Sequence, residues 1–223
     1  MEKKKQFCVD TANGKQEFDL FQALANYTPF DEIEAGHLKS VCEFISRGGD
    51  LFSRSNLEGH INGSGFLMNA DLTKLLMTHH KALDKWLQFG GHSDGDENTM
   101  NVAARETMEE SGIENFKPLI NGIADIDVHP IPENKKKGEP EHLHYDIRFI
   151  FTTDESEYIV SDESNDLRWL TLDEFKQLET NEARQRFIAK WETLQKERAK
   201  GVESGNRQSN GGQGTAPTVD PSV

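Results

Sequence analysis

The stretch that decides the fold is residues 90–113, GGHSDGDENTMNVAARETMEESGI. Asn98 or Thr99 can cap a helix that runs through MNVAARETMEES, and Gly112 is a natural residue just past its end. The predicted helix carries three acidic residues at positions i, i+3 and i+4: Glu106, Glu109 and Glu110. Side chains at this spacing project from one face, so we expect the three carboxylates to be neighbours.

Such crowding of negative charge opposes folding. Like charges at this spacing destabilise a helix, and these lie in its C-terminal half, where the helix dipole disfavours anions. A hard divalent cation with oxygen ligands would reverse both effects, which makes Mg²⁺ or Mn²⁺ the expected cofactor. The alternative is a solvated acidic helix face that binds nothing.

The residues around the acidic face add to this pattern. Gly90 and Gly91 follow the apolar run WLQF and predict a tight turn that lets the backbone approach the helix. Arg105 directly precedes Glu106, and Glu97 lies in the preceding loop. We expect an Arg105–Glu97 ion pair that fastens the loop to the helix.

This stretch resembles a Nudix box, which has Gly, five residues, Glu, seven residues, Arg-Glu, an aliphatic residue, any residue, Glu-Glu, any residue, Gly and an aliphatic residue. One position departs from it, because Thr107 stands where an aliphatic residue is usual. The resemblance spans about Gly59 to Phe175, and the runs GGHSDGD, DVHPIP and EPEHLHYDIRFI are similar to a bacterial Nudix subgroup. The matching positions are Gly91, Glu97, Arg105, Glu106, Glu109, Glu110, Gly112 and Ile113.

The resemblance implies an activity: hydrolysis of a diphosphate linkage in substrates that join a nucleoside diphosphate to another group, using water and a divalent metal ion. It assigns metal binding to the Glu106, Glu109 and Glu110 carboxylates and the Gly91 carbonyl. Nudix enzymes often add an acid from a later loop as general base or ligand, and of Asp162 and Glu163 we choose Glu163; the alternative is a solvated loop acid. The implied catalytic set is Glu97, Arg105, Glu109, Glu110 and Glu163.

The rest of the chain predicts an α/β (α+β) architecture, in which a mixed sheet is sandwiched between helices. We expect an N-terminal helical extension over residues 1–56, a Nudix domain over 57–180, a C-terminal helix over 181–200 and a disordered tail over 201–223. In the extension, an apolar helical stripe is predicted to bury Leu38, Val41, Cys42 and Ile45.

A second polar cluster is predicted on two strands. In HLHYDIRFIF apolar residues alternate with polar ones, so one face packs on the core and the other carries His142, His144, Asp146 and Arg148. If the preceding strand, which ends in DVH, is an antiparallel neighbour, His129 joins them. We expect His129, His142, His144 and Arg148 to contact the substrate; the alternatives are an exposed polar face and a zinc site.

Composition excludes some functions. The chain has 25 Lys and Arg against 39 Asp and Glu, a net charge of −14, so general nucleic-acid binding is not expected, whereas a small anionic nucleotide-like substrate can be held through a cation. No run is apolar enough to span a bilayer, and two cysteines give no disulfide framework. We expect a cytoplasmic protein that does not associate with a membrane. A homodimer is a possible assembly.

Two other functions fit the same resemblance. A non-catalytic nucleotide sensor would commonly lack glutamates of the box, and this chain keeps them. An isoprenoid diphosphate isomerase would need a cysteine near the metal, but Cys8 and Cys42 precede the box region.

Overall fold

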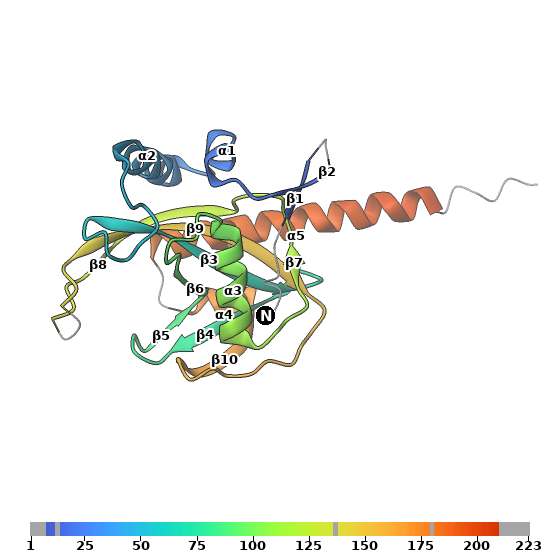
Figure 1. Cartoon of the computed structure of the whole chain (residues 1–223). Helices are drawn as coiled ribbons and strands as arrows, with labels where there is room; N and C mark the ends of the chain where they lie inside the picture. Colours follow the sequence, from blue (N-terminus) through green and yellow to red (C-terminus); the bar gives the residue numbers. More distant parts are fainter. Residues whose placement is uncertain (1–7, 12–13, 136–137, 179–180, 210–223) are drawn as a thin grey trace, which may run out of the picture.

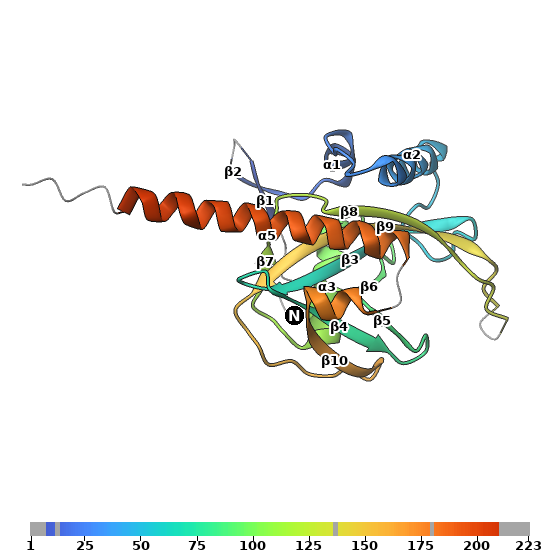
Figure 2. The same cartoon turned by 180° about the vertical axis from the view of Figure 1, so that it is seen from behind.

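The computed structural model describes residues 8–11, 14–135, 138–178 and 181–209. Its centre is a curled mixed β-sheet, and the two opposed views place helix α3 (Thr99–Ser111) on one face and helix α5 (Glu182–Ser209) on the other (Figures 1 and 2). This is the sandwich of helices around a mixed sheet that the sequence predicts.

The main sheet has eight strands: β3 (Gly59–Asn69), β4 (Lys74–His80), β5 (Lys85–Leu87), β6 (Phe89–His92), β7 (Lys117–Pro118), β8 (Asp125–Ile131), β9 (His142–Thr153) and β10 (Ser164–Thr171). The path runs β10-β4-β3-β9-β7, while β5 pairs with β4, β6 with β3 and β8 with β9. Among the described strands only β3 and β9 pair in parallel, and β8 pairs with β9 in the antiparallel way on which the grouping of His129 with His142 and His144 depends.

The short pairing between β3 and β4 leaves space beside β3 for the first residues of the Nudix box. These strands pair only where Leu67 and Met68 oppose Leu76 and Leu75, so the first half of β3 is left for β6 to pair with. Gly90 and Gly91 therefore lie within β6, paired with β3, and do not form the tight turn that the sequence predicts.

Glycines in β3 let α3 approach the sheet closely. A Cβ added to Gly63 would lie 2.9 Å from the amide nitrogen of Ala103, and one added to Gly65 would overlap the hydroxyl of Thr107. A larger residue at either position would push the helix off the strand.

Both faces of the sheet are buried. Ile61, Phe89 and Ile147 belong to the core on the α3 side, while Phe66 stacks on Phe187 of α5 with ring centroids 3.6 Å apart on the other. Strand β9 is buried at every residue from 145 to 153, so the face predicted to be polar is buried together with the core face, and at the beginning of the strand Leu143 of the predicted core face is exposed. Helix α5 covers the second face, as is common for strands in the middle of a sandwich.

The N-terminal segment contains a hairpin, β1 (Cys8–Thr11) and β2 (Gly14–Glu17), which was not predicted, followed by α1 (Leu20–Ala25) and α2 (Glu32–Arg47). Phe44 of α2 stacks on Tyr145 of β9 with centroids 4.1 Å apart, so the extension shares the core of the domain. The predicted burial of Cys42 is wrong. Val41 and Phe44 are buried, and Cys42 is exposed because adjacent helical residues point about 100° apart.

The N-terminal helix α2 and the C-terminal helix α5 meet in a buried ionic cluster. Lys190 of α5 places its Nζ 2.6 Å from Glu34 of α2 and 2.8 Å from Asp125 of β8, and Arg186 binds the same aspartate at 2.7 Å. Glu34 and Asp125 are fully buried, so these contacts offset the cost of dehydrating their charges.

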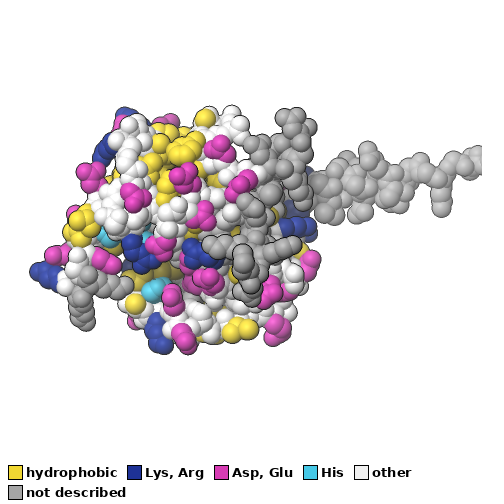
Figure 3. Space-filling model, in the orientation of Figure 1, with side chains coloured by type: hydrophobic (Ala, Val, Ile, Leu, Met, Phe, Trp, Pro, Cys, Tyr) yellow, Lys and Arg dark blue, Asp and Glu magenta, His cyan; other side chains and the backbone are white. Residues whose placement is uncertain are grey.

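The last two described elements are the helices α4 (Leu172–Lys176) and α5. Helix α5 continues to Ser209, whereas the sequence predicts its end at residue 200. The remainder of the predicted tail, residues 210–223, lies outside the described residues. Among the described helices, none combines the length and apolar character needed to cross a bilayer. On the face in Figure 3, acidic side chains are widely spread and the Lys and Arg side chains lie among them.

Candidate functional site

Helix α3 begins and ends where the sequence predicts. The Asn98 side chain accepts a hydrogen bond from the Asn101 amide at 3.0 Å, and Gly112 takes the left-handed conformation, with φ of 69°, that closes the helix. The residue that departs from the Nudix pattern, Thr107, is fully buried, and its hydroxyl donates to the Ala103 carbonyl at 2.7 Å. A polar atom at this apolar position is therefore satisfied.

Two of the three glutamates lie directly against the glycines of β6. A Cβ added to Gly91 would be 2.6 Å from each carboxylate oxygen of Glu106, so this position must be glycine for the carboxylate to lie there. The Glu110 Oε1 atom accepts a hydrogen bond from the Gly90 amide at 3.0 Å. The third glutamate, Glu109, is exposed on the same side of the helix.

Burial disfavours the negative charge of both inner carboxyls. It raises the pKa of Glu110 to about 8, and the charges of Glu106, Glu163 and Glu109 add to this rise, while the hydrogen bond from Gly90 opposes it. Burial also raises the pKa of Glu106, with Arg105 acting in the opposite direction. The positive charge of Arg105 does not outweigh burial and the neighbouring carboxylates, so the pKa values of both groups stay raised.

Arg105 contacts the helix acids rather than the loop. Its Nη1 is 2.6 Å from Glu106 and 3.6 Å from Glu109, and its Nη2 donates to the His92 carbonyl at 3.2 Å. Within the described ranges no ion pair joins Arg105 to Glu97, which is exposed, so the structure contradicts that predicted pair. Glu106 and Glu109 are within reach on the same helix and occupy the guanidinium.

The chosen loop acid, Glu163, is exposed in the segment that leads into β10. Its backbone carbonyl accepts from the Lys81 amide at 2.9 Å, which fixes the segment against the end of β4. Its negative charge adds to the raised pKa values of both Glu106 and Glu110.

The residues of β8 and β9 that we predict to contact the substrate lie in two different environments. His129 opposes His144 across the strand pair, and the Nε2 atoms of His142 and His144 are 3.3 Å apart. Arg148 is buried, and its guanidinium binds three aspartates, Asp125, Asp127 and Asp146, at 3.2, 2.8 and 2.7 Å. This enclosure favours a structural role for Arg148 over a direct substrate contact.

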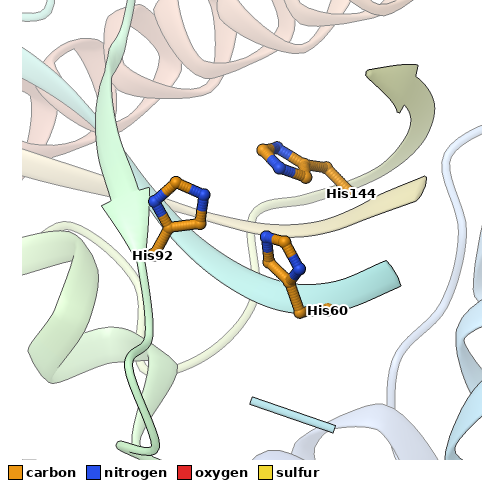
Figure 4. A group of neighbouring side chains, drawn as sticks. All are labelled: His60, His92 and His144. Carbon is orange, nitrogen blue, oxygen red and sulfur yellow. The ribbon is translucent and has the colours of Figure 1, made fainter. Parts of the chain in front are cut away.

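The structure also brings together three histidines that the sequence analysis did not select as a group. His60, His92 and His144 come from β3, β6 and β9, and their rings face one another (Figure 4). Burial and the neighbouring imidazoles lower the pKa of His60 to about 4 and that of His144 to about 2, and burial also lowers the pKa of His92. Strand register, not spacing along one segment, is the signal that places them together.

The carboxylates and the histidines lie on opposite sides of β6. Gly91 faces Glu106 of α3, and successive side chains of a strand point to opposite faces, so His92 faces away from that helix. On the same side as His92, the ring centroids of His60 and His144 are 5.0 and 5.4 Å from its own.

Comparison with known proteins matches this arrangement to one family. The model of the NUDIX domain matches residues 60–191, while no curated protein matches the sequence. A Nudix-family hydrolase from Clostridium perfringens shares 21% identity, with 60% of this chain and 97% of that chain covered and a TM-score of 0.44. The dihydroneopterin triphosphate pyrophosphohydrolase of E. coli shares 16%, with 56% and 90% covered and a TM-score of 0.44.

A third solved structure, the NUDIX domain of Shewanella oneidensis NrtR complexed with ADP ribose, shares 13% identity, with 79% of this chain and 99% of that chain covered and a TM-score of 0.43. The domain match alone spans more than half of the sequence and contains the whole glycine–glutamate cluster. The chain therefore belongs to the NUDIX domain family.

Proposed function

We propose that this protein hydrolyses the diphosphate linkage of a small substrate in which a nucleoside diphosphate is joined to another group, with Mg²⁺ or Mn²⁺ as cofactor. The observation that carries the proposal is the placement of Glu106 and Glu110 against Gly90 and Gly91 of β6. A half-buried and a buried carboxyl, both with raised pKa values, lie beside a strand whose lack of Cβ atoms leaves room for them.

The donor set fits a hard divalent cation. Glu106, Glu109 and Glu110 supply carboxylate oxygens from one turn of α3, and we assign the Gly91 carbonyl as a further ligand. A bound cation would neutralise the charges that the protein leaves uncompensated, and it supplies electrostatic stabilisation of the phosphoryl group and activation of water.

The chain's own residues position the reaction. Arg105 holds the Glu106 carboxylate at 2.6 Å and anchors it to the His92 carbonyl, while Glu97 belongs to the loop that enters the helix. In the proposed reaction a water oxygen bonds to one phosphorus atom, the bridging P–O bond breaks, and Glu163 takes the proton of the water. The two products each retain a phosphate group.

The polar ends of β8 and β9 are proposed to contact the non-reacting half of the substrate through His129 and His142, which are half-buried. Arg148 would position His129 and would not contact the substrate itself. It binds Asp127, and an Asp127 carboxylate oxygen lies 3.0 Å from the Nδ1 atom of His129. His144 lies between the two histidines. Recognition by such groups suits a small anionic nucleotide. The formation of a homodimer remains a prediction from the sequence.

The experiment that tests the proposal offers the purified protein nucleoside triphosphates, dinucleoside polyphosphates and nucleotide sugars with Mg²⁺ or Mn²⁺, and detects phosphate after an added phosphatase. Turnover that Glu110→Gln abolishes and the exposed control Glu157→Gln retains would support hydrolysis. Metal-dependent ligand binding without turnover across the whole panel would instead support the nucleotide-sensing function.

A further inference from the structure

Strand register gathers histidines on the side of the sheet that faces away from α3. His60 of β3 opposes His144 of β9, and His92 of β6 opposes Asn62, which points to the same face as His60 because it lies two residues along β3. Three adjacent strands thus each contribute one imidazole to a single spot (Figure 4).

The three rings are close enough to share one ion. One nitrogen from each of His60, His92 and His144 can be chosen so that all three lie within 4.8 Å of one another. His60 is 1% exposed, and neither of its ring nitrogens makes a hydrogen bond of ordinary geometry within the described part of the chain. Buried polar groups are nearly always paired, so this ring lacks a partner that a bound ion would supply.

We propose that His60, His92 and His144 form a binding site for a transition-metal ion of the Zn²⁺ class. Imidazole nitrogens suit Zn²⁺, Ni²⁺ and Co²⁺, whereas Mg²⁺ requires oxygen ligands. The ion would join β3, β6 and β9 at the ends where the sheet carries polar side chains.

His142 lies beside this site but is not part of it. Its Nδ1 donates to the Pro140 carbonyl at 2.8 Å, and its Nε2 lies 3.3 Å from the Nε2 of His144. We keep His142 as a proposed substrate contact, so the chain supplies three ligands to the ion and leaves its fourth position open.

This site is separate from the proposed Mg²⁺ site. Glu106 lies against Gly91 on the α3 side of β6, whereas His92 points to the other side, so neither metal needs the ligands of the other. The inference therefore stands or falls independently of the proposed hydrolysis, and each can be tested while the other site is filled or removed.

The test uses the full chain, stripped of metal with a chelator and then held in excess Mg²⁺. Titration with Co²⁺ is followed by its visible absorption, which reports tetrahedral coordination, and Zn²⁺ affinity is measured by competition with a chromophoric chelator. We expect one ion per chain, an affinity loss beyond roughly 100-fold in His92→Ala and in His144→Ala, and a rise in Tm with Zn²⁺ that these variants lack.

Matched variants make the result decisive. His92 and His144 are half-buried, so their removal disturbs packing less than removal of the buried His60, and circular dichroism checks each fold. His79→Ala on β4 and Glu106→Gln should both retain the Co²⁺ spectrum. Co²⁺ binding that survives in His92→Ala and His144→Ala, or that Glu106→Gln abolishes, would overturn the proposal. A wild-type protein that binds no Zn²⁺ in the presence of excess Mg²⁺ would also overturn it.

Discussion

The burial of Glu110 predicts an unusual dependence of stability on pH in metal-free protein. Its carboxyl is 7% exposed, and its pKa is raised from 4.5 to about 8 in the folded chain. The folded state therefore holds a proton that the unfolded state has lost between these two values, and the free energy of unfolding falls as pH rises through this window. Glu110→Gln removes the titration while its amide oxygen can still accept from Gly90.

The expected magnitude follows from the two pKa values. With 4.5 in the unfolded chain and about 8 in the folded one, the contribution of Glu110 changes by about 2.5 kcal/mol between about pH 5.5 and about pH 7.5. The Glu110→Gln variant lacks this loss, so its free energy of unfolding should increase relative to the wild type by that amount over the same interval.

Urea denaturation in chelator, followed by circular dichroism at several pH values, measures the difference directly. Glu157→Gln, an exposed carboxylate outside the cluster, is the matched control and should follow the wild type. Saturating Mn²⁺ should remove the advantage of Glu110→Gln. A difference between the two proteins that stays constant with pH would refute the reasoning that folding raises the pKa of Glu110.

Three further changes test other parts of the structure. Gly91→Ala should abolish turnover and leave a cooperative thermal melt, because its Cβ would lie 2.6 Å from the Glu106 carboxylate oxygens. Lys190→Met should lower the free energy of unfolding by about 3–5 kcal/mol in a urea titration, because it leaves Glu34 and Asp125 buried with fewer partners; a loss under about 1 kcal/mol would contradict this. Thr107→Val should lower the free energy of unfolding by less than about 1.5 kcal/mol in the same titration, since it removes one hydrogen bond whose acceptor, the Ala103 carbonyl, is a helical backbone group.

Local features of the site could be predicted from the sequence. The caps of α3 and the shared face of its glutamates depend only on residues a few positions apart, and the structure has both. The alternation of polar and apolar residues predicts both β8 and β9 as strands, whereas their antiparallel pairing was only a condition, which the structure meets.

Features that depend on distant segments could not be predicted. Arg148 is enclosed because α5, which follows it by many residues, brings Arg186 and Lys190 to the same aspartates, so the face that alternation marks as polar is buried. The grouping of His60 with His92 and His144 requires the register between β3, β6 and β9, and no single segment contains that information.

The most direct test of the central claim is the rate of diphosphate hydrolysis as Mn²⁺ is added to chelator-treated protein, compared with the rate for Glu110→Gln. The account predicts no turnover in chelator, recovery with Mn²⁺ in the wild type and in Glu157→Gln, and none at any Mn²⁺ concentration in Glu110→Gln. Hydrolysis that proceeds in chelator, or that Glu110→Gln retains at the wild-type rate, would contradict the assignment of the glutamate cluster as the catalytic metal site.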